Sequence, residues 1–264
     1  VPVIETAVEM FAMLEADGKM ARAMTDLGIV LENATNYESA LSRFQSAADL
    51  SREIDDRQML AAQHSNIGRI YDLRLNRYPE AIRHYTAALD LYQEMGEPEK
   101  IAESRLNIGR CHRLLGVFPK AADCYEKALK TLDQLDGQTG GPARLRAKII
   151  IEQANNAWFQ GEFETAFRLQ RECAKLAAQN DLPLLRVISQ NTAGLIWWSL
   201  GNYEKALTEL ENGLKMARDL SIREDEVAST LNNIGLVHRE MGDYEKALQR
   251  FDQALEIDKR LMSK

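Results

Sequence analysis

The sequence has few of the residues that punctuate sheet proteins, and it lacks long apolar runs. Only 15 glycines and 6 prolines occur in 264 residues, which is too few for the turns of a protein built from many short strands. No apolar run reaches the roughly 18 residues of a membrane span, and no basic leader precedes an apolar stretch at the N-terminus. The chain opens at Val1 rather than at a methionine, so it could equally be a fragment of a longer protein.

An excess of positive charge is also missing. The chain has 33 basic and 40 acidic residues, a net charge of −7, and such a surface does not attract a polyphosphate backbone. Neither nucleic acid nor a membrane is expected as a partner. Cysteine is scarce: Cys111, Cys124 and Cys173 form no C-x-x-C pair, which is typical of buried thiols in a reducing compartment. We therefore expect a cytoplasmic protein.

Motifs for catalysis and metal binding are absent as well. The sequence contains no G-x-S-x-G elbow and no G-x-x-x-x-G-K-[ST] phosphate cradle. The four histidines never occur at H-E-x-x-H or H-x-x-x-H spacing. The sequence therefore predicts no enzyme, no metal site and no cofactor.

What the sequence does contain is a pattern of four positions that recurs six times. An aromatic residue at a helix start is followed after three residues by alanine and after seven more by another small residue. These aromatic residues are Tyr37, Tyr78, Phe118, Phe163, Tyr203 and Tyr244. Upstream of each stands a small residue, here called the marker: Gly28, Gly68, Gly109, Ala154, Gly194 and Gly235. Small residues recurring on one helical face allow a neighbouring helix to approach closely, so each repeat is predicted to be a helical hairpin.

Helical periodicity places the helices of each pair. Gly116, Gly161, Gly201 and Gly242 stand between paired helices and fit the left-handed residue that closes many helices. Residues 1–18 are expected to hold one leading helix, as the end of an upstream repeat would. Residues 135–142 form the longest loop between repeats within 19–264, either a lengthened turn or a hinge between two three-repeat halves. The predicted pairs are 19–34 with 37–53, 57–75 with 78–94, 98–114 with 118–134, 143–160 with 163–179, 183–200 with 203–219, and 223–240 with 243–262.

These columns resemble the tetratricopeptide repeat over about residues 19–262. The spacing of 40 to 45 residues exceeds the usual period of roughly 34. It is similar to the repeats of kinesin light chains, Pins-type adaptors and Rap-type peptide-sensing regulators. The resemblance implies an all-α fold, a right-handed superhelix (α-solenoid) of antiparallel helix pairs whose first helices line a concave groove.

Several residues of the first helices are candidates for contact with a peptide in that groove. The string N-I-G-R at 66–69 and 107–110 puts an amide and a guanidinium on one helical face in two adjacent repeats. An asparagine can pair with both polar groups of a peptide unit, and arginine can bind a carboxylate. This predicts a positive, amide-rich patch, unless these residues only bond between helices. Trp158 and Trp198 are either groove-exposed or buried, and Trp197 is assigned to the core. The predicted groove residues are Asn66, Arg69, Asn107, Arg110, Arg113, Asn155, Trp158, Asn191 and Trp198.

Two functions agree with these observations. The first is a protein-interaction scaffold that binds a peptide segment of a partner, one carrying acidic or carboxylate groups, in its concave groove. The second is a ligand- or peptide-sensing regulatory module of a larger signalling or effector protein. Repeats alone do not choose between them.

Overall fold

The chain consists of stacked helix pairs in two compact units. The computed structural model describes residues 5–6, 17–135 and 141–262, and the regular secondary structure in these ranges is entirely helical. Unit 1 is Val1–Asp136 and unit 2 is Gly137–Lys264. The division falls inside the segment 135–142 that interrupts the repeat spacing. The predicted leading helix lies almost wholly outside the described residues, as do residues 136–140 of the long loop.

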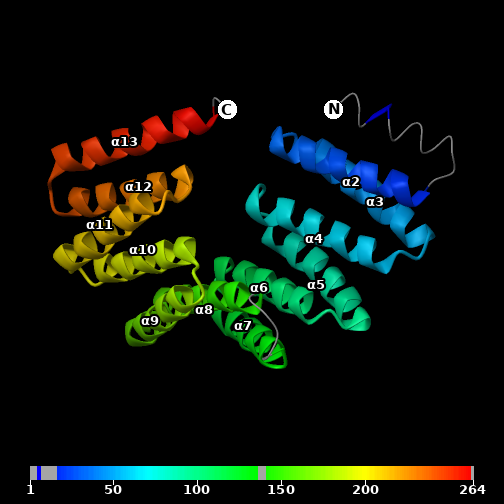
Figure 1. Cartoon of the computed structure of the whole chain (residues 1–264), viewed down its shortest axis with the longest axis horizontal. Helices are drawn as coiled ribbons and strands as arrows, with labels where there is room; N and C mark the ends of the chain where they lie inside the picture. Colours follow the sequence, from blue (N-terminus) through cyan, green and yellow to red (C-terminus); the bar gives the residue numbers. More distant parts are fainter. Residues whose placement is uncertain (1–4, 7–16, 136–140, 263–264) are drawn as a thin grey trace. The chain divides into compact units, whose positions relative to one another are not determined.

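Unit 1 holds three consecutive antiparallel pairs (Figure 1). The first helices of the pairs are α2 (Asp17–Asn33), α4 (Arg57–Leu73) and α6 (Pro98–Leu114). The second helices are α3 (Tyr37–Glu53), α5 (Tyr78–Met95) and α7 (Phe118–Asp133). The second helices of the first two pairs also pack on the first helix of the next pair, α3 on α4 and α5 on α6, so the repeats of unit 1 contact their neighbours in turn.

Unit 2 repeats this arrangement. Its first helices are α8 (Gly141–Phe159), α10 (Pro183–Ser199) and α12 (Glu224–Glu240), and its second helices are α9 (Phe163–Gln179), α11 (Tyr203–Asp219) and α13 (Tyr244–Met262). The predicted all-helical stack of antiparallel pairs is confirmed in both units. Over the described ranges every predicted helix is present, with ends that differ by at most two residues from those expected.

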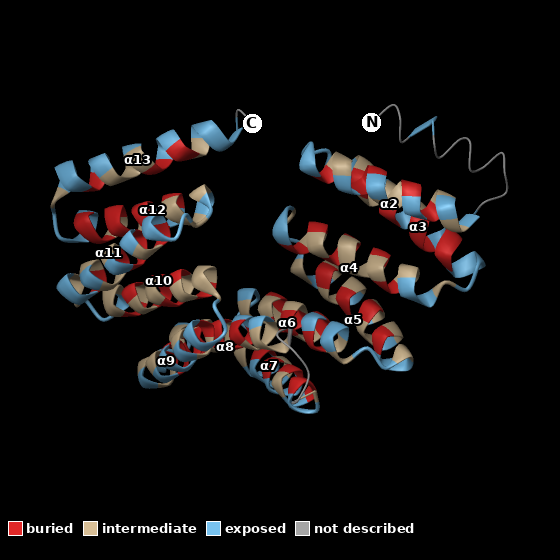
Figure 2. Ribbon diagram, in the orientation of Figure 1, coloured by how far each residue is buried: buried red, intermediate tan, exposed pale blue. Residues whose placement is uncertain are grey.

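The marker residues explain why the paired helices approach so closely. In unit 1 each marker glycine faces a ring from the second helix of its pair. A Cβ atom added to Gly28 would lie 2.6 Å from Cε1 of Phe44, and one added to Gly109 would lie 2.5 Å from Cε1 of Tyr125. Any larger residue would therefore push the helices apart. Figure 2 shows the buried residues along the faces where the helices meet.

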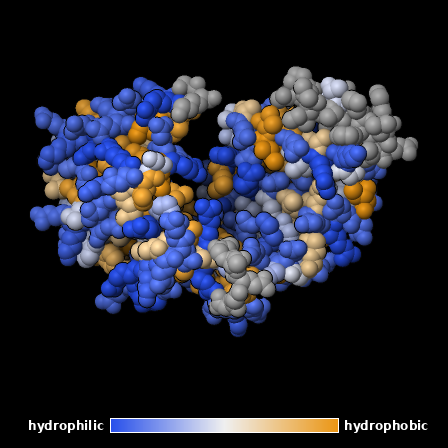
Figure 3. Space-filling model, viewed as in Figure 1, coloured by the Kyte–Doolittle hydropathy of each residue, from blue (hydrophilic) through white to orange (hydrophobic). Residues whose placement is uncertain are grey.

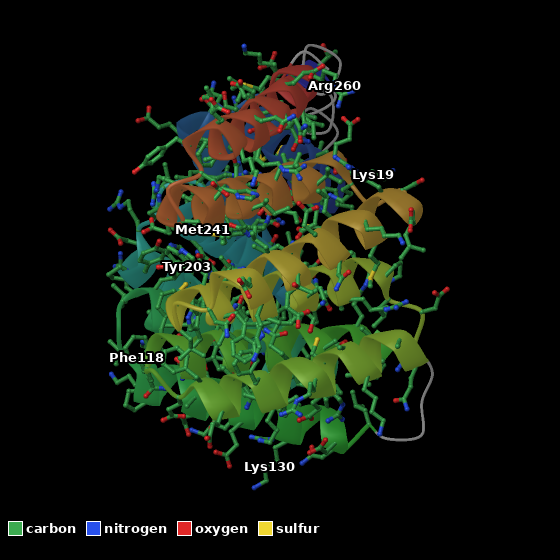
Figure 4. All side chains as sticks on the ribbon, turned by 90° about the vertical axis from the view of Figure 1, so that its left-hand side faces the viewer. Lys19, Phe118, Lys130, Tyr203, Met241 and Arg260 are labelled. Carbon is green, nitrogen blue, oxygen red and sulfur yellow. The ribbon has the colours of Figure 1, made fainter. Side chains whose placement is uncertain are left out.

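A left-handed residue closes each described turn within a pair. The predicted glycines Gly116, Gly161, Gly201 and Gly242 have φ between 71° and 81°, which confirms the expectation, whereas Thr35 and Asn76 take this role in the first two repeats. Figure 4 shows that the turns within the α10–α11 and α12–α13 pairs lie along one edge, where Tyr203 and Met241 are labelled, while Arg260 lies toward the other end of α13.

The surface and the thiols follow the sequence expectation. On the face shown in Figure 3, hydrophilic residues cover most of the surface and apolar residues form separate patches. Cys111 and Cys173 are buried and Cys124 is half-buried, all as free thiols. Over the described ranges, no helix has the length and apolar character needed to cross a membrane.

Candidate functional site

Four of the predicted groove residues line one cleft in unit 1. This α4–α6 cleft has a volume of about 310 Å³ and is bordered by Asn66 and Arg69 of α4 and by Asn107 and Arg110 of α6. Tyr85 and Tyr92 of α5 also line it, together with Ser65, Ser104, Lys100 and Glu103. The two N-I-G-R strings are thus brought together, as the repeat spacing predicts.

Local packing turns these side chains toward the cleft. Gly68 and Gly109 are buried against rings of their paired helices, whereas Ile67 and Ile108 are buried against the second helix of the preceding pair. Because the buried pair occupies the middle of each string, its first and last residues fall on the open side of the helix. Asn66 and Arg69 are accordingly half-buried rather than buried.

Arg69 is tied to the preceding repeat. Its Nη1 donates to Oε1 of Glu32 in α2 over 2.6 Å, and the Glu32 side chain is only 2% exposed. Nε of Arg74 approaches the same oxygen at 3.4 Å. A buried carboxylate requires such partners, since an unpaired charge is costly away from water.

Arg110 makes the equivalent bond one repeat further on. It donates to Oδ2 of Asp72 in α4, whose side chain is 1% exposed, and the Tyr85 hydroxyl donates to the same oxygen over 3.3 Å. Burial, with a smaller contribution from Asp72, raises the pKa of the Cys111 thiol to about 12. The same two causes raise the pKa of Tyr85. Both groups therefore stay protonated donors at neutral pH.

The arginines consequently carry less uncompensated charge than the sequence alone suggests. The sequence predicts a positive patch, but Arg69 and Arg110 each share their charge with a buried carboxylate of the preceding repeat. The alternative of bonding between helices, which the sequence left open, is therefore realised for both guanidinium groups. Both arginines nevertheless line the cleft, and both residues are half-buried.

The amides of the cleft are less engaged. Oδ1 of Asn66 accepts one long bond of 3.4 Å from Arg69, and Asn107 makes no side-chain hydrogen bond to another described residue. Both side chains are half-buried. Arg113 is half-buried at the last turn of α6, where the helix dipole stabilises a positive charge.

A second hollow continues the same side of unit 1 between α2 and α4. It has a volume of about 450 Å³ and is lined mainly by polar residues, among them Asp26, which stands two residues before its marker as Asn66 and Asn107 do. Gln63 of α4 donates to Oγ1 of Thr25 in α2 over 2.8 Å at this place. Polar side chains therefore line the first-helix side across all three pairs of unit 1, and the position two residues before the marker is polar in each of them.

The four predicted residues of unit 2 have different surroundings. The prediction that Asn191 lines a groove is wrong, because its side chain is buried and its Nδ2 donates to Glu226 (2.9 Å) and Thr230 (2.7 Å) of α12. Asn191 instead joins two repeats. Burial raises the pKa of Glu226, an effect that this bond opposes.

The tryptophans of unit 2 are partly covered. Trp158 is half-buried and its indole N–H donates to Oγ of Ser199 over 2.9 Å. Trp198 is half-buried against the core formed by α11, α12 and α13. Trp197, assigned to the core from its column, packs on the same cluster and is also half-buried. Asn155 is half-buried on α8.

The repeated helix pairs define an α-helical repeat protein with a cleft between first helices. The sequence profile of the tetratricopeptide repeat matches residues 19–94, 58–134 and 185–260. The chain therefore belongs to the tetratricopeptide repeat family. Residues 135–184, which lie between the matched ranges, hold the repeat whose marker is Ala154. No curated protein is significantly similar to the chain in sequence.

Solved structures share the fold at low sequence identity. The apo form of RapI is 14% identical with a TM-score of 0.72, covering 92% of this chain and 85% of its own. A Rap protein complexed with Competence and Sporulation Factor is 14% identical with a TM-score of 0.67, covering 97% and 80%. A putative kinesin light chain of Podosopora anserina with nearly identical TPR-like repeats is 15% identical with a TM-score of 0.54, covering 76% and 95%.

Proposed function

We propose that this protein is a non-catalytic interaction module that holds an extended peptide segment of a partner in the α4–α6 cleft. The observation that carries the proposal is the meeting of Asn66 and Asn107, two repeats of one position, at a single cleft. An amide can donate to the carbonyl and accept from the N–H of one residue of an extended chain, because both groups of that residue point to the same side. Two amides in register thus suit a main chain lying across two repeats.

The charged groups at the cleft edge set the preferred peptide. Arg69 and Arg110 are half-buried at the cleft, and Lys100 is paired with the exposed Glu103 at 2.9 Å. An acidic side chain or a free carboxylate on the peptide would gain charge-assisted hydrogen bonds here. We place the protein in the cytoplasm because its three cysteines are free thiols.

The test uses selection of peptides from a random display library on the purified full chain, followed by affinity measurement in solution. The double variant Asn66→Ala/Asn107→Ala should bind the selected peptides about tenfold more weakly, because each lost hydrogen bond contributes about 0.5–1.5 kcal/mol. Asn233→Ala is the matched control, since Asn233 occupies the same position relative to its marker in the last repeat and should bind as the wild type does.

Two results would contradict the proposal. Selection that yields no binding peptide would remove the function itself. Peptides that bind the double variant and the wild type equally would move the contact away from the cleft.

A second candidate is a sensor module of a larger signalling or effector protein. It is favoured by the division of the chain into two compact units and by the shared fold of the Rap protein complexed with Competence and Sporulation Factor. Peptide binding that changes the hydrogen-exchange protection of residues near 135–142 would favour the sensor over a passive scaffold.

A further inference from the structure

A third hollow lies in unit 2, between the second helices α9 and α11. This α9–α11 pocket has a volume of about 720 Å³, with α10 as its floor. Small-molecule sites typically measure roughly 300–1,000 Å³, so its size suits a compact organic ligand. Its lining includes Phe167, Gln170, Ala174, Ala193 and Trp197.

The pocket exists because core positions of the repeat carry smaller residues here. The position just before the marker is Ala193 in this repeat, whereas three other repeats have buried isoleucines there, Ile67, Ile108 and Ile234. Eleven residues after the helix-start aromatic stands Ala174, whereas four repeats have Leu89, Leu129, Leu214 and Leu255. Two shortened side chains facing one hollow leave it unfilled, although protein interiors are otherwise close-packed.

A third position is polar instead of apolar. Gln170 stands where the other repeats have Phe44, Tyr85, Tyr125, Leu210 and Phe251. Its side chain is 3% exposed, and its Oε1 accepts from Oγ of Ser189 over 2.7 Å. Nε2 of Gln170 has no hydrogen-bond partner among the described residues. A buried donor without an acceptor is destabilising, so an acceptor arriving with a ligand would relieve that cost.

The wall of the pocket is aromatic and its rim is charge-balanced. The rings of Phe167 and Trp197 lie 4.6 Å apart between centroids at an interplanar angle of 43°. Such surfaces favour a flat apolar ring. The charged residues in the lining are two acids and two bases: Glu164, Glu209, Arg168 and Arg171. This balance gives a charged ligand little advantage.

We propose that the α9–α11 pocket is a small-molecule site for an uncharged compound with a flat ring and one hydrogen-bond acceptor. The ring packs on Phe167 and Trp197, and the acceptor takes an N–H of Gln170. The site lies in unit 2 and is independent of the peptide cleft of unit 1, so it stands or falls separately from the proposed function.

The first experiment compares two neutral probes, acetophenone and ethylbenzene, which share a ring and differ in one carbonyl. Both are titrated into the ¹⁵N-labelled full chain while NMR follows the indole N–H of Trp197 and the side-chain amide of Gln170. We expect both probes to shift Trp197, only acetophenone to shift the Gln170 amide, and acetophenone to bind about fivefold more tightly. The variant Gln170→Leu should abolish that preference.

The second experiment fills the pocket with the residues that other repeats carry. Ala193→Ile, and independently Ala174→Leu, should weaken both probes by about tenfold or more, while Ala178→Ile, an exposed position on α9, should not. Circular dichroism checks folding, and Ala174→Leu carries the test if Ala193→Ile does not fold. The proposal would be overturned if a folded Ala193→Ile or Ala174→Leu variant bound the probes as tightly as the wild type. It would also be overturned if neither probe, at its solubility limit, shifted the Trp197 or the Gln170 resonance.

Discussion

Nη1 of Arg69 lies 2.6 Å from Oε1 of Glu32, so a guanidinium of one repeat is held by a buried carboxylate of the repeat before it. Arg110 and Asp72 form the same pair one repeat later. In each pair the acid stands four residues after its marker and the arginine one residue after the next marker. In unit 2 these positions carry Trp158 followed by Leu195, and Trp198 followed by Leu236. An ionic pair in one unit is thus replaced by apolar residues in the other.

Removal of these arginines should destabilise unit 1 to different degrees. Arg110→Ala leaves the buried Asp72 without a charged partner and should lower the free energy of unfolding by about 3 kcal/mol. Arg69→Ala should cost about half as much, because Arg74 still approaches Glu32 at 3.4 Å. Urea denaturation measures both.

The matched control is Arg52→Ala. Its pair with Asp49 has both side chains more than half exposed and should contribute about 0.5 kcal/mol or less. Equal losses for Arg52 and Arg110 would show that burial of the carboxylate does not determine the effect. Because removal of Arg69 or Arg110 would also destabilise unit 1, asparagines rather than arginines are changed to measure peptide binding.

Acid should destabilise unit 1 through a histidine pair. Nδ1 of His64 and Nδ1 of His84 lie 3.1 Å apart, so one Nδ1 donates a hydrogen bond and the other accepts it. The two Nδ1 atoms therefore cannot carry a proton at the same time. Burial, and for His84 also the charge of His64, lowers the pKa of both rings, that of His84 to about 4. Arg52 and Arg83 act in the same direction, and Asp49 opposes them at His64.

The sign of this effect follows from proton binding. Between pH 6.5 and about 4 the unfolded chain protonates His84 and the folded chain does not, so stability present above pH 6.5 is lost as the pH falls through this window. The melting temperature should therefore drop from pH 7.5 to pH 5. His64→Gln/His84→Gln should show a smaller drop than the wild type, and an equal drop would assign the effect to other groups.

The turn at Thr35 should be improvable. Thr35 has a φ of 59°, a conformation unfavourable for a β-branched residue. Thr35→Gly should raise the free energy of unfolding by about 0.5–1 kcal/mol. The reverse change, Gly116→Ala, at a φ of 74° in an open turn, should lower it by a similar amount. Thermal unfolding of both variants decides, and a destabilised Thr35→Gly would contradict the prediction.

Gly109→Ala should be more harmful than Gly116→Ala. The added methyl group would lie 2.5 Å from Cε1 of Tyr125, which is buried and has little room to move. Overpacking of this kind typically costs about 1–3 kcal/mol. Urea denaturation should show the larger loss for Gly109→Ala, and a near-neutral result would mean that the α6–α7 pair can separate freely.

Much of the fold is determined by the sequence itself. The marker residues and the alanines that follow each helix-start aromatic recur because helices can approach only where side chains are small, so the pairs and their ends could be predicted from spacing. Gly116, Gly161, Gly201 and Gly242 could be assigned to left-handed turns for the same reason: few other residues adopt that backbone conformation without strain. These features depend on residues close together in the chain, so they can be predicted from the sequence.

Tertiary structure alone decided where the polar side chains point. Glu32 and Arg69 stand 37 residues apart, and only the offset between neighbouring first helices determines whether the guanidinium reaches the acid or the solvent. Asn191 looks like a groove residue in its helix but is covered by α12. Ala193 and Ala174 are visible as exceptions to their columns, yet a hollow forms only because no neighbouring side chain fills the space they leave. Packing between repeats, rather than sequence within one repeat, decides these outcomes.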